Sequence, residues 1–164
     1  MPAEQIGAAI AAAGWTLMTG GYGGLMGVAA RAAFEAGGRV VGLPMRGWTA
    51  LTPNQWNHEL RWSDDYPSRI GHLLAADAIV AVDGGIGTLS EAAIAWSVLQ
   101  TEPVAADLIF LGAGWPPVLS ALAEHLVIDD RDLAQVNVYA KADEVIAHIA
   151  GNEPRRVRVA GPRG

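Results

Sequence analysis

The sequence predicts an α/β protein built on a doubly wound parallel sheet, with helices on both faces in a three-layer α/β/α arrangement. Short apolar runs alternate along the chain with longer alanine-rich segments, and strands that alternate with helices pair in parallel. The run at residues 78–82 (AIVAV) is continuously apolar, which is typical of a strand buried on both faces of such a sheet.

Helices are expected where alanine-rich segments carry the right residues at their ends. The first, over residues 2–13, has proline at its start and glycine after its end, a common asymmetry of helix termini. Asp64 and Asp65 are N-cap candidates for a helix over residues 65–76, because their side chains can accept from backbone N–H groups of the first turn. The remaining helices are expected over residues 25–36, 88–100, 116–126 and 142–150.

Strands are expected where short apolar runs end at glycine, proline or a polar residue. Residues 45–57 show no clear period and are predicted to form a long loop. Trp48, Trp56 and Trp62 fall in and just after it, where they could stack on a base, line a dimer interface or pack the loop itself. The strands are expected over residues 15–19, 39–43, 60–63, 78–82, 104–111 and 136–139.

The composition suits one globular domain over residues 1–150, followed by a basic tail over residues 151–164 that contains four arginines. Cysteine is absent, which excludes disulfides and thiolate chemistry. The net charge of −6 is scattered, so it indicates solubility more than a special partner. We expect a cytoplasmic protein with no membrane span and no signal peptide, and we expect the tail to be solvated rather than bound to nucleic acid.

Two glycine turns follow predicted strands and lead into predicted helices. The first is TGGYGGLMG at residues 19–27, and the second is DGGIGTLSE at residues 83–91. Both turns should lie at the carboxyl edge of the sheet, where ligands bind, and the N–H groups that open the next helix can hold an anion. Neither turn fits the P-loop or the dinucleotide fingerprint, so a mononucleotide or a sugar phosphate is expected.

Glu91 stands about one turn into the helix that follows the second glycine turn. It could be a surface residue that interacts with the helix dipole. It could instead face the same cleft as the anion, where a carboxylate would stabilise a developing cation or activate a water. The residues alone leave both interpretations open.

Two stretches of the chain resemble the signatures of the Lonely Guy (LOG) family, long labelled possible lysine decarboxylases. They are GGYGGLMGVAARAAFEAGGRVVGLP, with the family's GLMG loop, and DAIVAVDGGIGTLSEAAIAW, with its P-G-G-x-G-T-x-x-E stretch. The resemblance runs over about residues 14–150. It implies a Rossmann-like fold, a homodimer or larger homo-oligomer, and a phosphoribohydrolase that cleaves nucleoside 5′-monophosphates such as AMP or cytokinin ribotides to free base and ribose 5-phosphate. No cofactor is expected.

The resemblance assigns roles to particular residues. Glu91 matches the family glutamate, and Arg69, in DYPSRI, takes the place of the family arginine; otherwise Arg69 would be a surface helix residue. Glycosidic cleavage builds oxocarbenium character on the ribose, which a carboxylate can stabilise, and an arginine can hold phosphate or ribose oxygens in a fixed fork. The residues expected to bind substrate or phosphate are Gly20, Gly21, Met26, Gly84, Gly85, Gly87 and Thr88.

The sequence departs from the family pattern at several positions. Asp83 replaces a proline and either adds a negative charge to the phosphate turn, caps the helix or is neutralised by a neighbour. Ile70 replaces a lysine, and the interval from Arg69 to Asp77 is one residue short. The family's opening strand and its Gly-Ser-Ser turn are also expected to be missing, which would expose a strand edge.

The sequence also bears on other possible functions. A pyridoxal phosphate enzyme needs a Schiff-base lysine, and the single lysine, Lys141, is far in sequence from both glycine turns, so lysine decarboxylation is rejected. The four histidines lack ligand-like spacing, and no metal is expected. The serious alternative is a nucleotide or cofactor binding protein, like the molybdenum-cofactor carrier among related glycine-loop proteins. Asp83, the missing lysine and the missing opening strand favour it, whereas Arg69 and Glu91 favour an enzyme.

Overall fold

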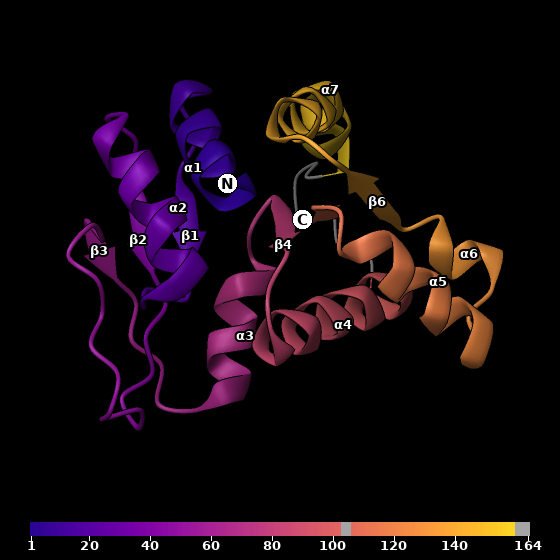
Figure 1. Ribbon diagram of the computed structural model, residues 1–164, viewed down its shortest axis with the longest axis horizontal. Helices are drawn as coiled ribbons and strands as arrows, with labels where there is room; N and C mark the ends of the chain where they lie inside the picture. The colour runs from indigo at the N-terminus through magenta and orange to yellow at the C-terminus, as the bar shows by residue number, and fades with distance from the viewer. Residues whose placement is uncertain (103–105, 160–164) are drawn as a thin grey trace. The chain divides into compact units, whose positions relative to one another are not determined.

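The computed structural model describes residues 1–102 and 106–159, and the chain divides into two units, Met1–Ala76 and Asp77–Gly164. Each unit holds a three-stranded parallel sheet with flanking helices (Figure 1). The predicted parallel α/β class is therefore confirmed, with the strands distributed over two sheets. The single domain over residues 1–150 stays a prediction.

Unit 1 carries the sheet β1-β2-β3, in which each strand runs parallel to its neighbour. The strand expected at residues 60–63 lies slightly earlier, and an isolated bridge between Met45 and Ser63 continues the pairing beyond it. Asp65 is confirmed as the N-cap of the last helix of the unit. The elements are α1 Pro2–Ala12, β1 Leu17–Thr19, α2 Gly24–Glu35, β2 Val40–Gly42, β3 Glu59–Leu60 and α3 Tyr66–Leu74.

The alanine-rich character of the first two helices serves their mutual packing. Ala30 and Ala33 of α2 are fully buried. A methyl group added to Gly7 of α1 would collide with the backbone carbonyl of Ala29 in α2. Small side chains therefore let the two helix backbones approach closely, and bulkier residues would force them apart.

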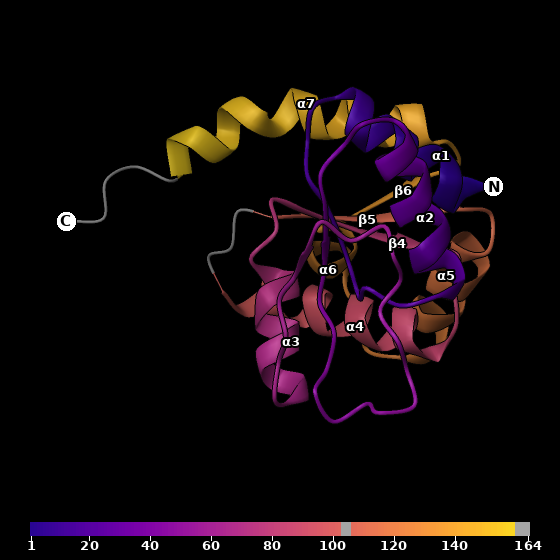
Figure 2. The same cartoon turned by 90° about the vertical axis from the view of Figure 1, so that its left-hand side faces the viewer.

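Unit 2 carries the sheet β4-β5-β6, with β5 in the centre. The side chains of Leu108, Ile109, Phe110 and Leu111 in β5 are 0–2% exposed. Helix α7 lies on one face of this sheet, and α4 and α5 lie on the other (Figures 1 and 2). The elements are β4 Ala78–Val82, α4 Ile86–Thr101, β5 Asp107–Leu111, α5 Trp115–His125, α6 Asp130–Leu133, β6 Val136–Tyr139 and α7 Ala142–Val159.

Aromatic side chains fix α4 and α5 on their face of the sheet. Phe110 of β5 packs edge-on against Trp115 of α5 and Trp96 of α4, with ring centroids 4.7 and 6.5 Å apart. The Trp96 indole N–H also donates to the Asp132 carbonyl at 2.9 Å. Large aromatic areas buried in this way stabilise a core strongly.

The last helix continues beyond its predicted end at residue 150, into the segment expected to be a tail. Asn152 anchors this extension, because its amide contacts His148 Nε2 at 3.0 Å and donates to Asp107 Oδ2 at 3.3 Å. Residues 160–164, the end of the expected tail, lie outside the described residues. Within the described part of the chain, no helix combines the length and apolar character needed to cross a membrane.

Candidate functional site

The first glycine turn is fastened to the loop predicted at residues 45–57. The Gly21 N–H donates to the Thr19 hydroxyl at 3.0 Å, and its φ of 83° favours glycine. The Gly21 carbonyl accepts from the Asn54 N–H at 2.8 Å and from the Asn57 amide at 3.1 Å. The Asn54 amide donates to the Tyr22 carbonyl at 2.8 Å. The loop thus holds the turn in one conformation.

The helices that follow the two glycine turns begin without a side-chain cap. Gly23 is the N-cap of α2 and Gly85 is the N-cap of α4, and no described side chain accepts a capping hydrogen bond at either helix start. In contrast, Asp65 caps α3 and Asp129 caps α6. Uncapped helix starts present backbone donors and a positive dipole end, which suit an anionic ligand.

Asp65 fixes the start of the helix that carries Arg69. Its carboxylate accepts from the Ser68 N–H at 2.7 Å. This backbone hydrogen bond holds the pKa of the Asp65 carboxyl below its usual value, because it favours the charged form. Arg69 then lies one turn further along α3, at a defined position on the helix.

Arg69 is buried against the first glycine turn. Its side chain is only 3% exposed, so the alternative of a surface helix residue is wrong. Its Nε donates to the Leu43 carbonyl at 2.8 Å. A methyl group added to Gly20 would lie 2.5 Å from Arg69 Nη2 and 2.6 Å from Met26 Sδ. Two residues of the first glycine turn and the arginine of α3 therefore meet at one point, where a side chain at Gly20 would displace Arg69 and Met26.

Three aromatic residues, Tyr22, Trp48 and Tyr66, form an aromatic cluster beside Arg69. The Arg69 guanidinium carbon lies 5.3 Å from the Trp48 ring centre and 5.9 Å from that of Tyr66. The Trp48 ring lies 5.8 Å from Tyr22 and 6.2 Å from Tyr66. Such distances are those of cation–π and aromatic contacts.

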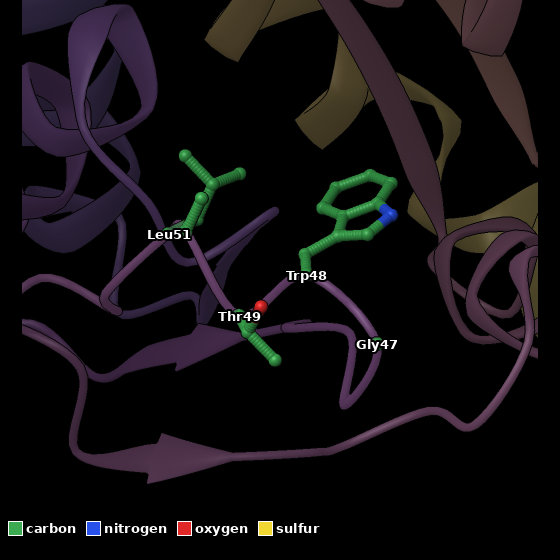
Figure 3. A pocket seen from close by; sticks show the side chains of 5 residues that line it. Gly47, Trp48, Thr49 and Leu51 are labelled. Atoms are coloured by element: carbon green, nitrogen blue, oxygen red, sulfur yellow. The ribbon is translucent and has the colours of Figure 1, made fainter.

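Beyond the aromatic cluster, the loop borders an open hollow of about 450 Å³ (Figure 3). Its apolar lining includes the Trp48 indole, the Leu51 side chain and the backbone of Gly47. Trp62 does not line this hollow and lies over Arg46, 5.8 Å from the guanidinium carbon to the ring centre.

The second glycine turn is tied to the turn that follows β5. The Asp83 N–H donates to the Leu111 carbonyl at 3.1 Å, and the Asp83 carboxylate accepts from the Gly114 N–H at 3.2 Å. The same carboxylate fills the space where a side chain at Gly112 would stand, and Gly112 has a φ of 132°. Asp83 therefore does not cap the helix of its own turn; it bonds to the backbone of the neighbouring one.

The other residues of the second turn are arranged around the start of α4. The Thr88 side chain folds against Gly84, and Gly85 and Gly87 are exposed with open space beside them among the described residues. Glu91 is half-buried in the second turn of α4. Because residues three and four apart share a helix face, Glu91 lies on the same side as Gly87 and Thr88.

Comparison with known proteins identifies the family. Residues 1–106 match the model of the SLOG cluster4 family. The chain belongs to this LOG-like family. Over 134 residues it is 34% identical to a cytokinin riboside 5′-monophosphate phosphoribohydrolase from Rhodococcoides fascians. The aligned region covers 77% of this chain and 67% of the relative. The resemblance to the LOG family is thereby confirmed.

Solved structures similar to this SLOG cluster4 protein share its fold. The molybdenum cofactor binding protein of Rippkaea orientalis is 24% identical with a TM-score of 0.73, covering 92% of this chain and 85% of that chain. The molybdenum cofactor carrier protein of Chlamydomonas reinhardtii is 25% identical with a TM-score of 0.71 and the same coverage.

Each unit of the SLOG cluster4 protein carries one glycine turn and one of the two expected catalytic residues. Gly20, Gly21, Met26 and Arg69 lie in unit 1, and Gly84, Gly85, Gly87, Thr88 and Glu91 lie in unit 2. Sequence reasoning missed the role of Asn54 and Asn57 in holding the first turn, and it missed the contacts of the aromatic cluster with Arg69. Tyr66 could have been found, because it stands three residues before Arg69 on a predicted helix.

Proposed function

We propose that this SLOG cluster4 protein is a phosphoribohydrolase that cleaves the N-glycosidic bond of an AMP-like or cytokinin-type nucleoside 5′-monophosphate. The buried Arg69 guanidinium beside Gly20 of the first glycine turn is the observation that carries the proposal. A buried cation at a ligand-binding turn suits an anionic substrate. The identity to the Rhodococcoides fascians phosphoribohydrolase supports the same activity.

The second glycine turn would hold the phosphate of the substrate. The uncapped start of α4 offers its N–H groups and the positive end of its dipole, and the exposed Gly85 and Gly87 allow a ligand to approach the backbone closely. Thr88 can add a hydroxyl donor at the same helix start. These features suit a phosphomonoester better than an uncharged nucleoside.

The reaction is a hydrolysis in which one bond breaks and one forms. A water oxygen attacks C1′ of the ribose while the bond from C1′ to the base nitrogen breaks, and the base leaves with a proton. Positive charge develops on the ribose as the bond weakens. In this proposal the Glu91 carboxylate stabilises that charge or orients the water, and Arg69 fixes phosphate or ribose oxygens. We also propose that the protein forms a homodimer or a larger homo-oligomer.

The test is release of free base from AMP and from isopentenyladenosine 5′-monophosphate, measured by chromatography. We expect Arg69→Ala and Glu91→Ala each to lower kcat/KM at least about 100-fold, as loss of a charged group at a reacting centre commonly does. The control variants Arg46→Ala and Glu102→Ala remove the same side-chain types at exposed positions and should keep full activity. Base release that survives both Arg69→Ala and Glu91→Ala would contradict the proposed site.

A non-catalytic nucleotide or cofactor carrier is the second candidate. Asp83 favours it, because this residue stands where the pattern of the family with hydrolase activity has proline. The 25% identity to the Chlamydomonas reinhardtii molybdenum cofactor carrier protein points the same way. Tight binding of molybdenum cofactor without release of base from any nucleotide would establish this alternative.

A further inference from the structure

We propose that Trp48 is a positioning residue that holds the Arg69 guanidinium in a fixed plane against the first glycine turn. The inference deepens the proposed function and rests on it for the role of Arg69. Trp48 lies in a loop without hydrophobic periodicity, and its contacts within unit 1 support this role.

Arg69 is held by groups of different chemistry. The Leu43 carbonyl accepts from Nε at 2.8 Å and fixes one edge of the guanidinium. The rings of Trp48 and Tyr66, 5.3 and 5.9 Å from the guanidinium carbon, fix its plane. Tryptophan is the strongest of the aromatic partners for a cation, and the attraction grows where the cation is removed from water, as it is for Arg69.

Trp48 is itself well supported. Its ring packs against Tyr22, whose hydroxyl accepts from the Met45 N–H at 2.8 Å. Asn54, further along the same loop, bonds to both Gly21 and Tyr22. The ring is therefore fastened through Tyr22 and its loop to the glycine turn that Arg69 faces, so its orientation is defined relative to that turn.

The contacts of Trp48 restrict the Arg69 side chain, which would otherwise adopt many rotamers. A guanidinium that is held in one pose before the substrate binds loses less entropy on forming its fork of hydrogen bonds. Removal of the indole should leave Arg69 in place but free it to tilt. Such a change lowers the rate of the chemical step more than it weakens substrate binding.

The first experiment compares kcat and KM for AMP hydrolysis among Trp48→Phe, Trp48→Ala and the control Trp62→Ala. Trp62 also lies over an arginine, but the side chain of that arginine, Arg46, is 63% exposed, whereas Arg69 is 3% exposed. We expect Trp48→Ala to lower kcat about tenfold to thirtyfold with KM changed less than about threefold, and Trp48→Phe to keep at least about a third of kcat. Trp62→Ala should behave like the wild type. A raised KM at unchanged kcat in Trp48→Ala would overturn the proposal.

The second experiment is a double-mutant cycle on unfolding, which needs no catalysis. Trp48→Ala should lower the folding equilibrium constant about tenfold more in the wild type than in Arg69→Met, because the cation–π contact exists only in the former. The same cycle with Trp62→Ala and Arg46→Met, an exposed pair, should give a coupling below about threefold. Equal effects of Trp48→Ala in both backgrounds would overturn the proposal. Strong coupling in a wild type that releases no base would instead refute the proposed hydrolysis and leave the positioning of Arg69 intact.

Discussion

At the residue scale, Asp83 has a contact that explains why a carboxylate stands in the second glycine turn. Its side chain accepts from the Gly114 N–H and occupies the space beside Gly112. A proline at this position, as in the family pattern, could not make that hydrogen bond. Asp83 therefore joins the turns after β4 and β5, and it keeps a negative charge close to the start of α4.

The two effects of Asp83 can be separated by substitution. Asp83→Asn keeps an acceptor for Gly114 but removes the charge, so the affinity for AMP should rise about threefold to fivefold, as expected for a nearby charge in a solvated site. Asp83→Ala loses the hydrogen bond and should cost about 1 kcal/mol of unfolding free energy. Calorimetric titration and urea unfolding measure these changes, with Glu102→Gln as the charge control. Unchanged or weaker AMP binding by Asp83→Asn would show that the charge does not oppose the anion.

Only some residues of the candidate site could be predicted from the sequence. Residues of the glycine motifs and Arg69 could be predicted because the family pattern places them, and Gly20, Met26 and Arg69 do meet in the structure. The role of Trp48 could not be predicted. Its partner depends on the path of a loop without periodicity, and long-range contacts of such loops are set by tertiary packing rather than by local sequence.

At the element scale, the pairing of α1 with α2 depends on the absence of side chains at the crossing. Gly7→Ala should destabilise the protein by about 1–3 kcal/mol, because the added methyl group meets the Ala29 carbonyl and the backbones must separate. Urea unfolding measures the loss.

The matched control is Gly71→Ala in α3, where among the described residues no atom beyond the adjacent residues and the local helix backbone lies within 4 Å of the added methyl group. It should stabilise the protein by about 0.5–1 kcal/mol through helix propensity. If Gly7→Ala proved as stabilising as this control, the close approach of α1 and α2 would be wrong.

The bounds of an element can be predicted best where the flanking residues differ clearly from the element in polarity. The run at residues 78–82 lies between Asp77 and Asp83, and β4 occupies this range; β6 occupies the range predicted at residues 136–139. Helix α6 is absent from the predicted elements, because its capping box lies in an acidic run that resembles a solvated turn. Helix α7 runs past Gly151, where the Asn152 contacts with Asp107 and His148 outweigh the local stop signal.

At the scale of the whole molecule, the alternation of strands and helices predicts parallel pairing but not which strands are neighbours. The structure divides the strands into the sheets β1-β2-β3 and β4-β5-β6. In each of the two units, a strand is followed by a glycine turn and then by a helix without a side-chain cap. Arg69 lies in the first unit and Glu91 in the second, so each variant of the proposed site is tested in the full chain.

The most direct test of the proposed hydrolysis is the reaction of AMP with the full chain in water labelled with oxygen-18. We predict equimolar adenine and ribose 5-phosphate, with the label on C1 of the sugar and no product from Glu91→Ala above about one hundredth of the wild-type rate. Mass spectrometry measures the label before it exchanges. AMP that binds the wild type and is recovered intact, with no adenine released, would contradict the proposed hydrolysis.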